Sequence, residues 1–372
     1  MLVSLVWRLW WALKFIVGVK NPAKSPASSS RDNRRSAFAA HVAEGFVNSP
    51  IPAAVLGEFD LIARYFTRSV KRAALGVGDD CALFAPSAGM QLAVSSDMLV
   101  EGRHFLSTVA PERLGHKALA VNLSDLAACG AKPIGFTLAL ALPRIDERFL
   151  DGFARGLLAL ADQHDCELIG GDTTQGPLNL CITVFGEVPA GRALLRDGAR
   201  AGDEIFVSGT LGDARLALEV FRGGAALDGA SFDLVRQAME TPQPRVALGL
   251  ALVGIATSAI DISDGLLGDL GHILRRSGVG ATLAVDEVPR SAVLAAQPVP
   301  LQREFTLAGG DDYELVFTAP ASRSDAVLAA AHRAGVGVTR IGRIDAELGL
   351  RLVDSNAAAV ANHFSSFDHF KS

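Results

Sequence analysis

From residue 57 onward the chain alternates between two kinds of apolar pattern. Apolar residues at helical spacing predict helices at residues 111–129, 149–164, 211–221, 232–254 and 266–276. Short apolar runs bounded by turn residues predict strands at residues 92–95, 136–142, 180–188, 204–209, 281–285 and 314–318, followed by a last helix and strand. This alternation is typical of an α/β or α+β fold.

Residues 197–203 (DGARAGD) form a turn-rich hinge between two series of elements. At 372 residues the chain has room for two domains, because single hydrophobic cores stop growing at roughly 250 to 300 residues. We therefore expect an N-terminal α/β domain over residues 57–196 and a C-terminal α/β domain over residues 197–372.

Residues 1–56 differ from the rest of the chain. Residues 1–19 are apolar and contain all three tryptophans, but Arg8 and Lys14 interrupt them, and the segment is short for a membrane-spanning helix. Residues 21–35 have the Pro-rich, Ser-rich and basic composition of a disordered linker. We expect residues 1–56 to be a dispensable extension or the product of an upstream start site, with a membrane-surface helix as the alternative and no firm membrane partner.

Charge and cysteine content narrow the classes of function. The net charge is −5, and residues 1–35 contribute +6, so the remaining chain carries −11. Such an acidic chain is a poor unaided partner for nucleic acid, and 6% aromatic residues are few for a base-stacking surface. Cys81, Cys129, Cys166 and Cys181 include no C-x-x-C pair, which favours reduced thiols in a cytoplasmic protein over disulfides or a structural zinc site.

Aspartates recur in Gly-rich or Ser-rich stretches, most of which adjoin apolar runs. The stretches are residues 76–81 (GVGDDC), 95–97 (SSD), 122–125 (NLSD), 170–172 (GGD), 261–265 (DISDG) and 309–312 (GGDD). Each one alone could be an ordinary turn or a helix cap. Together they favour strand ends that direct carboxylates into one cleft. Oxygen ligands without a His cluster favour Mg²⁺ as the metal.

Carboxylates that hold metal ions suit phosphoryl transfer, because metals and a few cations neutralise the charge on phosphate oxygens. The basic candidates are Lys117, Arg196 and His104, for each of which a purely structural role is the alternative. The chain has neither a G-x-x-x-x-G-K-[ST] loop nor the H-R-D and D-F-G motifs of protein kinases. A conventional nucleotide kinase is therefore disfavoured.

Six stretches carry a distinctive combination of motifs in a fixed order. They are residues 57–62 (GEFDLI), 76–82 (GVGDDCA), 117–128 (KALAVNLSDLAA), 170–174 (GGDTT), 261–266 (DISDGL) and 367–370 (FDHF). Together they closely resemble the thiamine-monophosphate kinase family. The resemblance implies a two-domain aminoimidazole-ribonucleotide-synthetase-like fold whose N-terminal domain forms a homodimer. It also implies transfer of the γ-phosphate of ATP to thiamine monophosphate, giving thiamine diphosphate and ADP.

The same resemblance implies roles for individual residues. Several Mg²⁺ ions would be held by Asp80, Ser95, Ser96, Asp97, Asp125, Asp172, Asp261 and Asp264. ATP would contact Gly171, Asp172, Arg196 and Ser263, and thiamine monophosphate would contact His104, Asp311 and Phe367. The family usually has Glu in place of Asp311 and Tyr or Trp in place of Phe367. The attacking phosphate oxygen is already anionic at neutral pH, so no side-chain nucleophile or strong general base is needed.

Two other interpretations are open at this point. One keeps the superfamily and changes the reaction, as in a cyclo-ligase or a selenophosphate synthetase. The latter would need a reactive cysteine near the start of the catalytic region, and no cysteine precedes Cys81. The other is a protein that binds divalent cations without catalytic activity, which predicts metal binding without ATP turnover.

Overall fold

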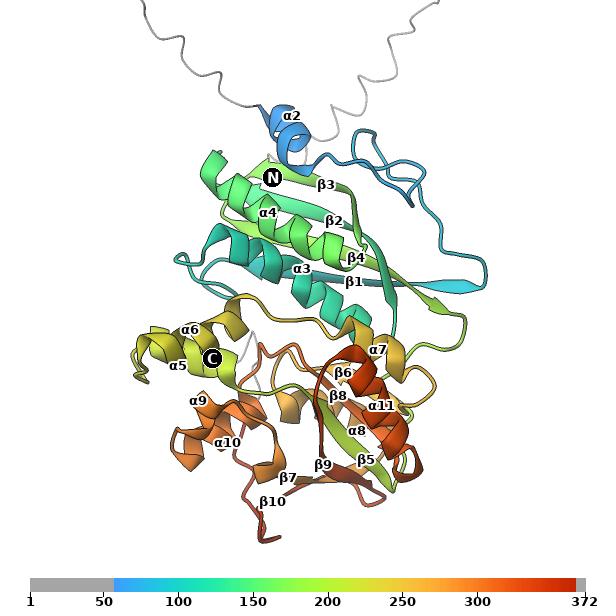
Figure 1. The fold of residues 1–372 in the computed structure, drawn as a ribbon, viewed down its shortest axis with the longest axis vertical. Helices are drawn as coiled ribbons and strands as arrows, with labels where there is room; N and C mark the ends of the chain where they lie inside the picture. Colours follow the sequence, from blue (N-terminus) through green and yellow to red (C-terminus); the bar gives the residue numbers. More distant parts are fainter. Residues whose placement is uncertain (1–56, 366–372) are drawn as a thin grey trace, which may run out of the picture. The chain divides into compact units, whose positions relative to one another are not determined.

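The computed structural model describes residues 57–365 of the chain. Their strands form two sheets, one of four strands and one of six, with helices packed on them (Figure 1). In this range no helix is both long enough and apolar enough to cross a membrane. The predictions for residues 1–56 and for Phe367 lie outside the described residues.

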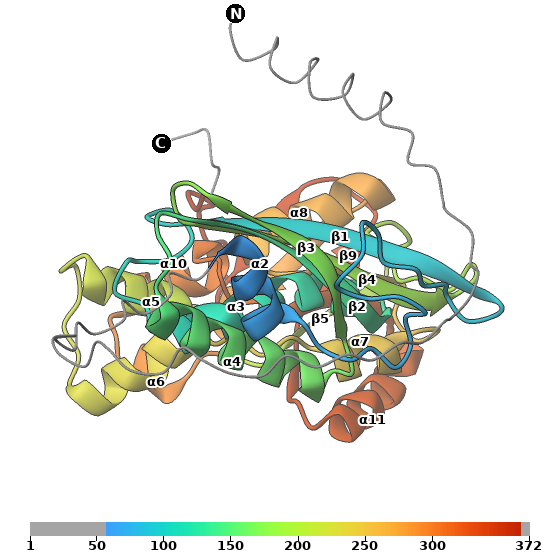
Figure 2. The same ribbon diagram turned by 90° about the horizontal axis from the view of Figure 1, so that it is seen from above.

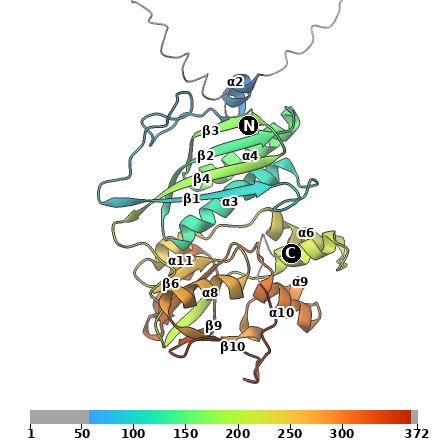
Figure 3. The same ribbon diagram turned by 180° about the vertical axis from the view of Figure 1, so that it is seen from behind.

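The first sheet has the strand order β1-β4-β2-β3. Its strands are β1 (Met90–Val100), β2 (Lys132–Leu142), β3 (Glu167–Gln175) and β4 (Asn179–Pro189). β4 pairs antiparallel with β1 and β2, whereas β2 and β3 run parallel because helix α4 (Glu147–Gln163) connects them. Helices α3 (Pro111–Ala128) and α4 lie along one face of the sheet (Figures 1 and 2), and Figure 3 shows the strands from the opposite face, with both helices behind them.

Side-chain alternation gives the two faces of β1 different environments. Ser95 and Asp97 lie against α3, where the Ser95 hydroxyl and the Asp97 backbone N–H donate hydrogen bonds to side chains of that helix. Val94 and Met98 point to the opposite face and are 56% and 55% exposed. This second face of the sheet is therefore apolar and accessible along β1.

Helix α3 is the central element of the described chain. It begins at Pro111, whose missing N–H is no loss at a first helical position, and its packing on α4 is very close. A Cβ atom on Gly156 would lie 1.8 Å from the Glu112 carbonyl oxygen, so this contact requires glycine. α3 also packs against α7 (Val246–Leu252) and β6 (Ser258–Asp261). These two elements belong to the second half of the described chain, residues 197–365, so α3 contacts both halves.

The second sheet has the strand order β10-β7-β9-β5-β8-β6. Besides β6 its strands are β5 (Asp203–Ser208), β7 (Gly280–Ala284), β8 (Leu315–Pro320), β9 (Val338–Asp345) and β10 (Leu350–Val353). The remaining helices are α2 (Glu58–Leu61) with the π-helical turn η1 (Ile62–Phe66), α5 (Asp213–Phe221), α6 (Gly229–Glu240), α8 (Leu266–Ser277), α9 (Ala292–Ala295), α10 (Val299–Ala308) and α11 (Ser324–Ala334). Short 3₁₀ turns, η2 (Val285–Glu287) and η3 (Ala321–Arg323), follow β7 and β8.

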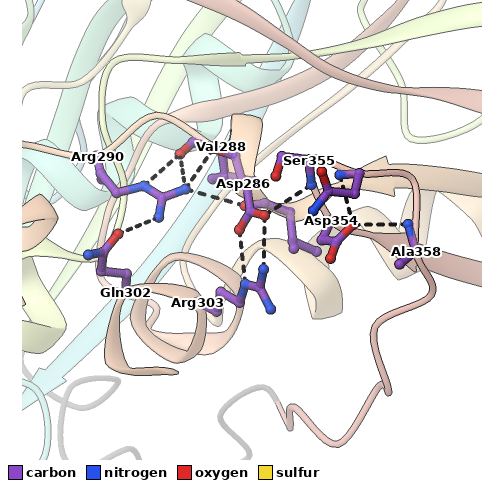
Figure 4. A network of polar contacts seen from close by, with 10 residues as sticks. Asp286, Val288, Arg290, Gln302, Arg303, Asp354, Ser355 and Ala358 are labelled. Atoms are coloured by element: carbon purple, nitrogen blue, oxygen red, sulfur yellow. Dashed lines mark hydrogen bonds and ion pairs between the residues drawn. The ribbon is translucent and has the colours of Figure 1, made fainter. Parts of the chain in front are cut away.

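A polar network fastens the segment after β10 to the body of the second half (Figure 4). The Arg303 guanidinium on α10 donates two hydrogen bonds to the Asp286 carboxylate, at 2.9 and 2.8 Å. The backbone N–H of Ser355 donates to the same carboxylate at 3.1 Å. These contacts hold the last described segment of the chain against η2 and α10.

The predicted fold class is confirmed, and most predicted elements are present. Several details differ, among them the following three. The predicted strand at residues 92–95 is part of a longer strand, and residues 167–175, where no strand was predicted, form β3. The predicted helix over residues 232–254 is two helices, because Pro242 and Pro244 cannot continue a helical hydrogen-bond ladder.

Candidate active site

The C-terminal half of α3 places polar side chains against β1. The Ser95 hydroxyl donates a hydrogen bond of 2.5 Å to the Asp125 carboxylate. The Asn122 side-chain oxygen accepts one of 3.1 Å from the backbone N–H of Asp97. The strand therefore meets the helix at residues 95 and 97 of β1 and residues 122 and 125 of α3. The position of both stretches beside apolar runs predicted this proximity.

Asp261, the last residue of β6, joins this group from the second sheet. It is buried and accepts a 2.8 Å hydrogen bond from the Ser124 hydroxyl of α3. Burial and then the charge of Asp125 raise the pKa of Asp261 well above its ordinary value. The pKa of Asp97 is raised to about 7, mainly by burial and further by the negative charges of Asp125 and Asp264. Burial also raises the pKa of Asp125. These carboxyl groups are crowded, and a divalent cation would favour their ionised forms.

The donor set matches one class of metal better than others. Within residues 57–365 no group of three or more His, Cys, Asp or Glu side chains has the arrangement of a complete metal site. Mg²⁺ does not require one, because it binds through one or two carboxylates and takes its other ligands from waters and substrate phosphates. The carboxylates along α3, β1 and β6 thus fit Mg²⁺ that is bound together with a nucleotide.

A buried aspartate organises the loop between β6 and α8. Asp269, in the first turn of α8, is 4% exposed. Its carboxylate accepts backbone N–H bonds from Ser263, Asp264 and Gly265, at 3.1, 3.1 and 3.2 Å. Gly265 has a φ of 114°, a conformation that favours glycine. Burial and then Asp264 raise the pKa of Asp269 to about 7.

Sequence reasoning missed Asp269. An acidic residue in the first turn of a helix is common at any helix N-terminus, so position alone gave no sign of its role. Its three acceptor bonds depend on how the loop folds back over the helix. Only the tertiary structure contains that information.

A second loop, between α10 and β8, hydrogen-bonds to the first. The backbone N–H of Asp311 donates to the Ser263 carbonyl at 2.7 Å, and that of Tyr313 donates to the Ile262 carbonyl at 2.8 Å. Asp311 and Tyr313 both have left-handed backbone conformations, with φ of 63° and 52°. The 261–265 and 309–312 stretches are therefore neighbours, as the idea of one cleft required.

Lys117 links this second loop to α3. Its side chain is 3% exposed, and its ammonium donates to the Asp311 carboxylate at 2.6 Å and to the His104 carbonyl at 3.2 Å. The His104 ring nitrogen Nδ1 accepts a 3.0 Å bond from the backbone N–H of Val100, which fixes the ring. The three side chains border a cavity of about 80 Å³ with a partly apolar wall that includes Phe105, Leu218 and Met239.

A larger cavity of about 750 Å³ lies beside the carboxylates. Ser95, Asp125 and Asp261 line it, as does Arg196 from the segment that joins the two halves. Arg196 is exposed, and its positive charge opposes the rise that burial causes in the pKa of Asp125. The cavity thus combines carboxylates and a guanidinium, which is the polarity that a metal-bound polyphosphate requires.

Three of the predicted site residues lie apart from α3. Ser96 is on the face of the first sheet that points away from α3, and Gly171 and Asp172 are on β3. The Ser96 hydroxyl contacts the Thr183 hydroxyl at 3.0 Å, away from α3. Asp172 is in register with Ala139 of β2, and Gly171 precedes it. A Cβ atom on Gly171 would lie 2.0 Å from the Leu138 carbonyl oxygen, so glycine is required there. β3 is three strand spacings from β1, or about 14 Å.

Asp80 lies in the loop between η1 and β1. Leu75 and Leu83 pair across this loop through backbone hydrogen bonds of 2.9 and 3.2 Å, and the turn between them presents Asp79 and Asp80 to solvent. The backbone N–H of Asp80 donates to the Asp79 carboxylate at 2.9 Å. No hydrogen bond among residues 57–365 joins this tip to the carboxylates of α3.

Comparison with known proteins defines the class first. Residues 78–188 match the family described as AIR synthase related protein, N-terminal domain, and residues 200–355 match the corresponding C-terminal domain. The fold is therefore that of the AIR synthase related proteins. Structures of the hydrogenase maturation protein HypE share it, with a TM-score of 0.69 at 20% identity.

The particular family follows from more similar relatives. Thiamine-monophosphate kinase from Salmonella typhimurium is 45% identical over 321 residues, which cover 84% of this chain and 98% of the relative. The crystal structure of thiamine-monophosphate kinase from Stenotrophomonas maltophilia is 46% identical with a TM-score of 0.73, covering 81% of this chain and 95% of that one. A structure of AaThiL complexed with AMPPCP and TMP is 30% identical with a TM-score of 0.67, covering 77% and 89%. The chain belongs to the thiamine-monophosphate kinase family.

Proposed function

We propose that this protein transfers the γ-phosphate of ATP to thiamine monophosphate, forming thiamine diphosphate and ADP. Family membership supports the reaction, and the layout of α3 supports the site. Lys117 borders the small cavity and Asp125 the large one, and their separation of eight residues corresponds to about 12 Å along a helix. One rigid helix therefore carries a cation for the acceptor phosphate and a carboxylate for a metal-bound nucleotide.

The chemistry needs positioning more than proton transfer. A phosphate oxygen of thiamine monophosphate is already anionic at neutral pH, so it can attack the γ-phosphorus directly, with ADP as the leaving group. Lys117 and Arg196 would hold phosphate oxygens and oppose their mutual repulsion. Mg²⁺, when bound, would supply further neutralisation of the phosphate charge.

We propose the following residue assignments. Mg²⁺ ions are held by the aspartates and serines at Asp80, Ser95, Ser96, Asp97, Asp125, Asp172, Asp261 and Asp264. ATP contacts Gly171, Asp172, Arg196 and Ser263, and thiamine monophosphate contacts His104, Asp311 and Phe367. The crowded carboxylates of α3, β1 and β6 support the metal assignments, and the cavity beside Lys117 supports those of His104 and Asp311.

We also propose that the active enzyme is a homodimer. Within one chain Asp172 lies on a strand about 14 Å from β1. Asp172 is in register with Met98 through β2 and β4, so it belongs to the apolar face that no described helix covers. A second copy packed on that face would bury Val94 and Met98 and would bring its own Asp172 toward Ser96 of the first, the proposed metal ligand that lies on the same face.

Two further assignments complete the proposal. The domains are residues 57–196 and 197–372, which agrees with family matches that end at residue 188 and resume at residue 200. The protein works in the cytoplasm, where a reducing environment suits its four free thiols.

A turnover assay tests the proposed function. Purified protein incubated with ATP, Mg²⁺ and thiamine monophosphate should form thiamine diphosphate and ADP in equal amounts, and D125N should reduce the rate at least about a hundredfold by removing a metal ligand. E147Q, which alters an exposed ion pair of α4, is the matched control and should keep full activity. ADP formation without thiamine diphosphate, or full activity of D125N, would contradict the proposal.

A further inference from the structure

The wall of the 750 Å³ cavity contains two basic side chains that the assignments above do not use. His272 and Arg276 both line it, and both lie on α8. They are four residues apart, so they occupy one face of the helix. Asp269 lies on the same face three residues before His272, at the end where the helix meets the 263–265 loop. A single stripe of α8 thus runs from the metal-side loop along the cavity.

These two side chains carry positive charge or N–H donors that form no ion pair or side-chain hydrogen bond within residues 57–365. Within residues 57–365 neither Arg276 nor His272 makes an ion pair or a side-chain hydrogen bond, and both are exposed. Arg196 lines the same cavity from the joining segment. Burial lowers the pKa of His272 most, and the positive charges of Arg275 and then Arg196 lower it further. Arg196 is therefore close to His272. Three donor groups therefore line the same cavity.

The lining of the same cavity also carries negative charge. Asp125 and Asp261 supply carboxylates, and Ser95 a hydroxyl. A ligand that fits this lining must offer cations to the carboxylates and phosphate oxygens to the basic groups. A nucleoside triphosphate with Mg²⁺ offers both, whereas an uncharged ligand would leave both kinds of group unpaired.

We propose that Arg276 and His272 contact the polyphosphate of the nucleotide, next to Arg196, and thereby determine affinity for ATP. This inference rests on the proposed function, because that function supplies the ligand. Arg276 contributes a guanidinium that can pair with two phosphate oxygens, and His272 contributes a ring N–H. Both act in ground-state binding, so their loss should weaken ATP affinity more than the rate at saturation.

The test compares R276Q and H272Q with R275Q. Arg275 is exposed on the same helix but does not line the cavity, so R275Q changes the same net charge without touching the site. R276Q should raise both the Kd of Mg·ATP and the KM for ATP about tenfold, and H272Q a few-fold. The KM for thiamine monophosphate should stay the same, and thermal unfolding should match that of the wild type. R275Q, which acts on the cavity only through the charge of Arg275 near His272, should change these values much less.

Direct binding measurements separate this inference from the proposed function. If the wild type binds Mg·ATP and R276Q weakens that binding, the inference stands even where thiamine diphosphate does not form. If R276Q and H272Q bind Mg·ATP as R275Q does, the inference is overturned even where the wild type makes thiamine diphosphate. Failure of the wild type to bind Mg·ATP at all would overturn both.

Discussion

The ammonium of Lys117 lies 2.6 Å from the carboxylate of Asp311, although 194 residues separate them in the chain. Lys117 belongs to the central helix α3, and Asp311 belongs to a loop of the second half that is held in a left-handed conformation. The pair therefore ties the two halves together at the border of the proposed acceptor site.

This ion pair should be asymmetric in its effect on stability. D311N leaves a buried ammonium with neutral oxygen acceptors only and should destabilise the protein by about 2 kcal/mol, less than a fully buried pair would because Asp311 is 36% exposed. K117M removes the buried charge, and Asp311 can still reach water, so it should cost about 1 kcal/mol or less. Unfolding in denaturant would measure both.

The control for this comparison is E147Q. Glu147 pairs with Arg64 at a site where both side chains are more than half exposed, and its loss should cost less than about 1 kcal/mol. The double variant K117M/D311N should be more stable than D311N alone. A larger cost for K117M than for D311N would contradict this account of the pair.

The crowded carboxylates predict how stability depends on pH. The pKa of Asp97 rises from 3.8 to about 7 on folding, so between these values the folded protein binds more protons than the unfolded chain. Without metal, this group should therefore make the protein less stable as pH rises from about 4 to about 7, with no further effect above that range. D97N should flatten the slope, and D233N, at an exposed position of α6, should not.

Mg²⁺ with ATP should change the same curve. The cation favours ionised carboxylates, so its stabilising effect should grow as pH rises through the same window. Thermal unfolding measured across pH, with and without Mg·ATP, would provide the comparison. An effect of Mg·ATP that is constant with pH would show that these carboxylates do not hold the metal.

Mixing two inactive variants tests the shared active site. D125N and D172N should each be inactive. If each site uses Asp125 of one subunit and Asp172 of the other, a mixed dimer has one intact site and one doubly altered site. Random exchange of equal amounts should then restore about a quarter of the wild-type activity, because half of the dimers are mixed and half of their sites are intact. No recovery, in dimers shown to exchange, would place both residues in one subunit's site.

Asp269 should affect metal binding through the loop it holds. Above pH 7, where a carboxyl with a pKa of about 7 is mainly ionised, D269N preserves the shape of the side chain but replaces a charged acceptor of three N–H bonds with a neutral and weaker one. The Mg²⁺ concentration for half-maximal rate should rise about tenfold, while the KM for thiamine monophosphate changes much less. Equal changes in both constants would indicate a general loss of structure instead.

The sequence by itself determined the class of fold and the family, and it predicted the carboxylate stretches of the candidate site. Apolar periodicity reflects burial on one face of each element, and that relation is local, so the helix at residues 111–129 was predicted almost to the residue. The motifs around Asp125 and Asp261 were visible for the same reason, since each is a short run of neighbouring residues.

The tertiary structure decided which of these residues meet. The alternation of β1 sends Ser95 toward α3 and Ser96 to the opposite face, and the strand order puts Asp172 about 14 Å from β1. The partners of Lys117 and Asp269 also depend on loops that fold back from distant positions. Such contacts are set by the packing of whole elements, and a one-dimensional pattern of residues does not encode packing in any local form.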